Sequence, residues 1–170
     1  MTALPGKLWH YTRDPLVVEP RAYEQPEPRE YGKPDGFWIS AEGKDDWPSW
    51  CEGEQFRLET LAHRAPVSLN DGANVLRLTP GMIDRFDSDF GVEWPWGENG
   101  RWIARGIDWR AVADRYDGII IAPYAWCFRL TMNWYYPWDC ASGCIWNLDA
   151  ITVGESEPHR LPELAERGAG

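Results

Sequence analysis

The stretch Gly36-Phe37-Trp38-Ile39-Ser40 decides the predicted fold, because it has the pattern of a short buried strand and carries the chain's most informative aromatic residue. It follows Pro34-Asp35, which is a turn signal. Alternation along a strand places Phe37 and Ile39 on one side, and Trp38 and Ser40 on the other. We therefore expect a turn that leads into a strand at this point.

A helix is predicted directly behind this strand, in Asp45-Asp46-Trp47-Pro48-Ser49-Trp50-Cys51. Asp45 or Asp46 is a suitable N-cap, and proline is tolerated in the first turn of a helix. Helical spacing places Trp47, Trp50 and Cys51 on one face. Trp38 and Trp50 then form two aromatic walls of one slot, although these residues alone favour two core tryptophans.

Two further stretches stand near the ends of the chain, Leu8-Trp9-His10-Tyr11-Thr12 and Ser142-Gly143-Cys144-Ile145-Trp146-Asn147. Together with residues 36–51 they resemble, in order, the three-part signature of ADP-ribosyltransferases of the diphtheria-toxin and poly(ADP-ribose) polymerase branch. In that branch a first strand carries His, a small residue and Ser or Thr. A second strand has Gly-aliphatic-Tyr-Phe-small, a helix with a second stacking aromatic follows, and a late strand carries Glu.

Each part of the signature has a counterpart here, with one departure. His10-Tyr11-Thr12 resembles the first motif, and Gly36–Ser40 resembles the second, with Trp38 at the tyrosine position. Trp50-Cys51 resembles the second stacking aromatic. In the late strand, Ser142 or Gly143 stands where the glutamate is expected. The missing glutamate predicts single-unit transfer or weak activity, not chain building.

The resemblance implies an NAD-dependent mono-ADP-ribosyltransferase-like enzyme that breaks the nicotinamide–ribose bond through an oxocarbenium-like state. A flat apolar slot holds nicotinamide, His10 hydrogen-bonds the ribose, and a carboxylate stabilises the developing positive charge. Asp139 is the replacement for the glutamate, with Ser142 as a polar helper; a turn cap is an equally good interpretation of Asp139. The implied catalytic residues are His10, Asp139 and Ser142, the implied NAD-binding residues are His10, Thr12, Trp38, Ser40, Trp47 and Trp50, and no metal is implied.

Two other functions stay open. In the first, the fold binds NAD, ADP-ribose or a protein but catalyses no reaction, and Gly143 favours this alternative. In the other, the 12 Trp serve a protein-interaction surface with no nucleotide site. The net charge of −10 argues against broad nucleic-acid binding, so a protein is the expected acceptor.

The cellular setting is inferred from what the sequence lacks. No apolar run is long enough to cross a membrane, and residues 1–6 do not have the pattern of a signal peptide. We therefore expect a cytoplasmic protein with no membrane contact, and a toxin or phage effector is compatible with this. Reduced free thiols are expected at Cys51, Cys127, Cys140 and Cys144.

The 170 residues predict one α+β domain over 1–154 and a polar C-terminal tail over 155–170. The expected architecture is two small packed antiparallel or mixed sheets, a few short helices and a cleft between the sheets. Residues 13–35 predict an irregular loop, and residues 91–106 a Gly-rich loop that contacts the target. Strands are predicted at 65–69, 74–78, 119–122 and 128–134, with helices from Thr79-Pro80 and from Asp108.

Overall fold

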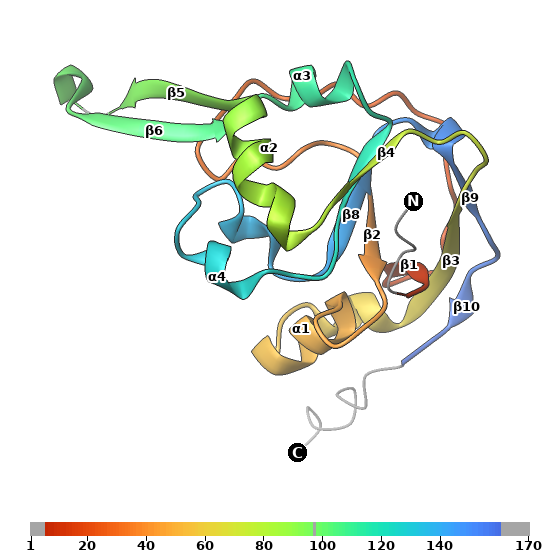
Figure 1. Ribbon diagram of the computed structural model, residues 1–170. Coiled ribbons are helices and arrows are strands. Elements are labelled where there is room, and N and C mark those ends of the chain that lie inside the picture. The colour runs from red at the N-terminus through yellow and green to blue at the C-terminus, as the bar shows by residue number, and fades with distance from the viewer. Residues whose placement is uncertain (1–5, 97, 161–170) are drawn as a thin grey trace.

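The computed structural model describes residues 6–96 and 98–160, with only the backbone of Trp96. Its main element is a curled, mixed 8-stranded sheet in the order β10-β3-β1-β2-β8-β7-β4, with β9 also paired to β3 (Figure 1). Among the described strands, only β4 and β7 pair in parallel. The strands are β1 (Leu8–Thr12), β2 (Phe37–Ala41), β3 (His63–Leu69), β4 (Val75–Leu78), β7 (Gly118–Ile121), β8 (Ser142–Ile145), β9 (Ile151–Val153) and β10 (Glu157–Pro158).

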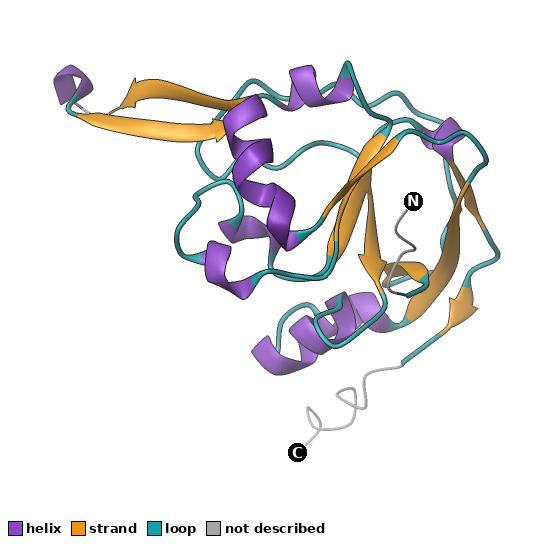
Figure 2. Ribbon diagram, viewed as in Figure 1, coloured by secondary structure: helices purple, strands orange, loops and turns teal. Residues whose placement is uncertain are grey.

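Short helices and one hairpin complete the fold (Figure 2). The hairpin consists of β5 (Gly91–Trp96) and β6 (Trp102–Ile107), and it projects from the body beside α2. The helices are α1 (Trp47–Glu54), α2 (Ile83–Phe90), α3 (Trp109–Ala113) and α4 (Trp126–Arg129), with 3₁₀ turns at Leu58–Leu61, Pro80–Met82, Glu98–Gly100, Tyr136–Trp138 and Leu148–Ala150.

The predicted α+β class is confirmed, but the arrangement of the sheets differs from the prediction. We expected two small packed sheets, whereas one curled sheet and a separate two-stranded hairpin are present. The reason is β1, which pairs with β2 on one edge and with β3 on the other, and so joins what would have been two halves.

The core is built around aromatic side chains on one side of this sheet. Trp109, Trp134 and Trp138 are each 1% exposed, and the Phe86 ring contacts both Trp109 and Trp134. Helical spacing in α2 turns Ile83, Phe86 and Phe90 inward, while Met82, which precedes the helix, is exposed. Much of the tryptophan content therefore serves packing.

Two local predictions were wrong, and a third segment contains a short strand that was not predicted. Residues 128–134 were expected to be a strand, but backbone bonds from Phe128 to Ala125 and from Thr131 to Phe128 close helical turns there. The predicted loop at 91–106 is the β5–β6 hairpin, paired from Gly91–Ile107 to Trp96–Trp102. The expected polar tail begins with an ordered strand, because Glu157–Pro158 pairs with β3; residues 161–170 lie outside the described part.

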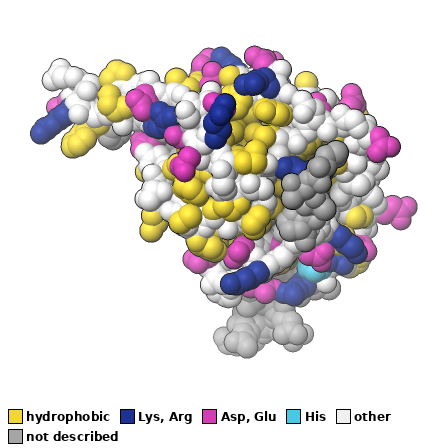
Figure 3. All heavy atoms as spheres, viewed as in Figure 1, with side chains coloured by type: hydrophobic (Ala, Val, Ile, Leu, Met, Phe, Trp, Pro, Cys, Tyr) yellow, Lys and Arg dark blue, Asp and Glu magenta, His cyan; other side chains and the backbone are white. Residues whose placement is uncertain are grey.

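The hairpin exposes apolar side chains far from the strands that carry the signature. Trp102 is 58% exposed and Ile103 66%. Figure 3 shows hydrophobic side chains on this projection, with charges of both signs scattered over the same face of the molecule. Within residues 6–96 and 98–160, no helix combines the length and the apolar character that a bilayer crossing requires.

Candidate functional site

The candidate site lies where the neighbouring strands β1 and β2 separate. β1 pairs with β2 at only two positions, Leu8–Ala41 and Trp9–Ser40. Beyond them β1 stays with β3, while β2 stays with β8, so the two strands diverge. A cavity of about 600 Å³ is lined by residues of both strands at this point, a size typical of small-molecule sites. The three stretches that carry the family resemblance thus lie on neighbouring strands, β1, β2 and β8.

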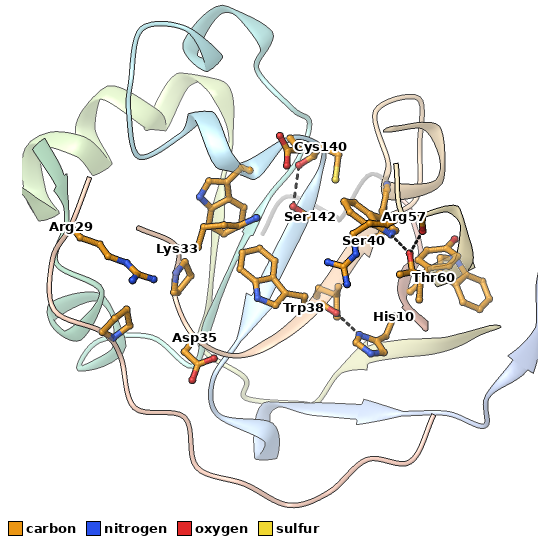
Figure 4. A pocket seen from close by; sticks show the side chains of 18 of the residues that line it. His10, Arg29, Lys33, Asp35, Trp38, Ser40, Arg57, Thr60, Cys140 and Ser142 are labelled. Atoms are coloured by element: carbon orange, nitrogen blue, oxygen red, sulfur yellow. Dashed lines mark hydrogen bonds between the residues drawn. The ribbon is translucent and has the colours of Figure 1, made fainter. Parts of the chain in front are cut away.

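His10 bridges the gap between the diverging strands. Its Nδ1 lies 2.6 Å from the Trp38 carbonyl oxygen (Figure 4). A carbonyl only accepts, so Nδ1 carries the proton and Nε2 of the neutral ring is left as an acceptor. Burial lowers the pKa of His10 below its usual value, against the opposing effect of this hydrogen bond. The ring also stacks on Phe37 with centroids 4.1 Å apart, which fixes its orientation.

By strand alternation alone, the side chains of His10 and Trp38 would point to opposite faces of the sheet. The register places Trp38 on the face of Ser40 and Trp9, and His10 on the opposite face with Leu8. Both nevertheless line the cavity, because β1 and β2 have already diverged at these positions. The two residues therefore line the same cavity, His10 from β1 and Trp38 from β2.

The second aromatic wall is Trp47, not Trp50. Trp38 and Trp47 both line the cavity. The Trp47 backbone N–H donates to Ser40 Oγ at 3.0 Å, and its indole N–H donates to Thr60 Oγ1 at 3.2 Å, so its position is fixed at both ends. Trp50 faces a separate, smaller hollow, where its ring lies near Trp126. The predicted pairing of Trp38 with Trp50 in one slot is therefore absent.

Asp139 lies at the wall shared by the cavity and the smaller hollow. Its Oδ1 accepts from Arg129 Nη1 at 2.9 Å, and both side chains are largely buried. Its backbone is strained, with φ 59° and ψ −42°, and the Cys140 N–H bonds back to the Trp138 carbonyl across it. This is a γ-turn with positive φ, which is rare and costs about 1–3 kcal/mol. Strain of this kind clusters at functional sites, which favours a role beyond a turn cap.

Three cations line the same cavity. Arg29 and Lys33 come from the 13–36 loop on one side, and Arg57 follows α1 on the other (Figure 4). Among the described residues, no carboxylate lies within ion-pair distance of any of them. The two other acids of the lining, Glu24 and Asp35, are exposed. In a chain of net charge −10, such a group of unpaired cations is suited to an anionic ligand.

No protein-family model matches this chain. The searches of curated proteins and of solved structures likewise give no significant match. Any function must therefore be argued from the cavity.

The other predicted site residues have structural contacts. Ser142 Oγ lines the cavity but donates to the Cys140 carbonyl at 3.0 Å. Ser40 is 4% exposed, and its hydroxyl serves the start of α1. Thr12 does not line the cavity; its buried hydroxyl has no partner in the described structure. Gly143 lies against the Ile119 backbone, where a Cβ would approach the carbonyl oxygen to 2.7 Å, so one of the two positions at which the glutamate was expected excludes a side chain.

The thiols near the cavity stay uncharged. Burial raises the pKa of Cys140 to about 12 and raises that of Cys144 as well. All four cysteines are free. Among residues 6–96 and 98–160, no three His, Cys, Asp or Glu side chains form a group that could hold a metal ion. Of the described acids in the lining of the cavity, Asp139 is half-buried, whereas Glu24 and Asp35 are exposed.

Sequence reasoning missed the cations. Arg29, Lys33 and Arg57 are dispersed, and no basic run marks them. One signal was present in the sequence. Lys33 directly precedes the turn Pro34-Asp35 that leads into β2, so Lys33 lies close to the start of the strand that carries the second motif.

Proposed function

We propose that this cavity binds NAD and that the chain is a mono-ADP-ribosyltransferase-like enzyme that breaks the nicotinamide–ribose bond. One observation carries the proposal. The cavity is lined by His10, Trp38 and Asp139, although His10 and Asp139 are more than a hundred residues apart in the sequence. The described lining also contains three cations without carboxylate partners.

The residues divide among the parts of the dinucleotide. Trp38 and Trp47 offer flat faces for a stacked ring, and stacking on an aromatic is worth about 1–3 kcal/mol per base. His10 Nε2 accepts a hydrogen bond from a ribose hydroxyl. Arg57 binds the diphosphate through charge-assisted hydrogen bonds.

Asp139 supplies the negative charge that the reaction needs. The bonding electron pair leaves with nicotinamide, positive charge develops on the sugar, and the acceptor nucleophile then adds to the same carbon. The Asp139 carboxylate stabilises that charge, and it also accepts a hydrogen bond from Arg129 Nη1. A protein is the acceptor we favour, because the acidic chain does not suit a nucleic acid. A cytoplasmic location belongs to the same proposal.

A second candidate, an NAD- or ADP-ribose-binding module without chemistry, is favoured by a specific observation. Arg129 already neutralises part of the Asp139 charge, and Gly143 leaves no space for the usual glutamate. In that case the cavity holds the nucleotide intact.

The test is a calorimetric titration with NAD followed by mass analysis for free nicotinamide. Binding with nicotinamide release supports the enzyme, and binding without release over long incubation supports the module. Trp38→Ala is expected to weaken binding by about 1–3 kcal/mol. An absence of both binding and thermal protection by NAD refutes both candidates and leaves the protein-interaction function.

A further inference from the structure

Lys33 is a half-buried residue in the lining of the cavity. Its Nζ lies 4.3 Å from the centre of the Trp38 ring and 6.0 Å from that of Trp138. It donates to the Pro137 carbonyl at 2.7 Å, which leaves donor positions on the same nitrogen that the described residues do not fill. The nitrogen therefore lies over the indole that we assign to ring stacking.

The half-buried Lys33 amine has no counter-ion among the described residues. No carboxylate of the described residues lies within ion-pair distance of Lys33. Desolvation lowers the pKa of Lys33; the more distant Asp139, Cys140 and Cys144 oppose this. An ammonium that is partly desolvated without a counter-ion is disfavoured, and lysines in such surroundings serve as nucleophiles or Schiff-base residues because the neutral amine is accessible.

We propose that Lys33 is a covalent modification site, whose Nζ attacks the sugar carbon of an ADP-ribosyl group held in the cavity. This deepens the function proposed above, since it places that carbon at the Trp38 face.

Two reactions follow from this placement. With NAD, a bond forms between Nζ and the ribosyl carbon, the bond to nicotinamide breaks with its electron pair, and the amine loses one proton. With free ADP-ribose, whose sugar opens to an aldehyde, Nζ condenses with the carbonyl and water leaves. A borohydride-type reductant then converts this imine to a stable secondary amine.

The aldehyde reaction provides a test that does not depend on NAD cleavage. The full chain is incubated with ADP-ribose and cyanoborohydride, and separately with NAD alone, followed by peptide mapping by mass spectrometry. The other lysines, Lys7 and Lys44, are exposed and act as internal controls. We expect the reduced adduct on Lys33 and not on Lys7 or Lys44.

Variants separate the chemistry from the fold. Lys33→Met should abolish the adduct, and Lys33→Arg should abolish it while retaining the cation and thermal protection by ADP-ribose. The same methionine substitution at Lys7 should leave the adduct on Lys33 unchanged. An even spread over all lysines, or ADP-ribose that binds without any reduced adduct on Lys33, overturns the inference.

The outcomes also separate this inference from the proposed function. Reductive labelling of Lys33 by ADP-ribose in a chain that never releases nicotinamide from NAD supports Lys33 and refutes the transferase. Nicotinamide release without labelling of Lys33 in either experiment supports the transferase and refutes Lys33.

Discussion

Replacing Asp139 by Asn tests whether its carboxylate acts on the substrate or only holds the local turn. The Asn oxygen still accepts from Arg129, but the charge is lost. Removing a positioned charge typically lowers a rate by a factor of about 10²–10³, and we expect nicotinamide release to fall by that factor with NAD affinity retained. The side chains of Arg129 and Asp139 are 14% and 28% exposed, between surface and buried pairs. The free energy of unfolding should therefore fall by about 1–2 kcal/mol.

Two comparisons make this result decisive. Arg129→Gln breaks the same ion pair and keeps the carboxylate, so a comparable loss of stability without the loss of nicotinamide release isolates the role of Asp139. Asp139→Gly should be more stable than Asp139→Ala by about 1 kcal/mol in urea denaturation, since only glycine adopts φ 59° without strain. The assignment is wrong when Asp139→Asn releases nicotinamide as fast as the parent.

Three more predictions concern binding. Trp47→Ala should weaken NAD binding by about 1–3 kcal/mol in calorimetry, while Trp50→Ala should not; the reverse result restores Trp50 to the site. Arg57→Gln should lower ADP-ribose affinity by about 1.5–3 kcal/mol and flatten its dependence on salt, unlike Arg101→Gln on the exposed hairpin, and an equal effect of both variants argues against a diphosphate contact. NAD affinity should fall in acid, as His10 protonates through its lowered pKa. Because the unfolded chain takes up that proton first, below about 6.5, the His10 contribution to the free energy of unfolding also decreases with falling pH, and His10→Gln should remove both effects.

Local sequence patterns predicted the elements whose formation depends on near neighbours. The apolar face of α2 and the buried strand β7 follow from spacing alone, and Asp108 accepts from the backbone of Arg110 and Ala111 at the start of α3 as a cap should. Residues 128–134 alternate like a strand, but their aromatic side chains pack on a core that is distant in sequence, and turns form instead. Tertiary packing overrode the local pattern there.

The site was predictable only in part, for a similar reason. His10 and Trp38 carry short motifs on strands, so their positions could be inferred. The choice of Trp47 over Trp50 depends on two hydrogen bonds, to Ser40 and to Thr60, that fix the rotation of α1 against β2. The convergence of the cations depends on where an irregular loop returns, and periodicity contains no information on that path.

The protonation state of Lys33 affects both the binding of NAD and the proposed reaction. A protonated amine over Trp38 opposes both a cationic nicotinamide ring and the positive charge that develops on the sugar, whereas the neutral amine opposes neither. Desolvation already favours the neutral form, and Asp139 is the nearby anion that resists it, because the Cys140 and Cys144 thiols stay protonated. We therefore expect NAD to release more protons on binding than ADP-ribose, which lacks the pyridinium, as measured by calorimetry in buffers of different ionisation enthalpy. Lys33→Met should abolish this difference. Equal proton release for the two ligands in the parent would show that the ring of NAD does not lie beside Lys33.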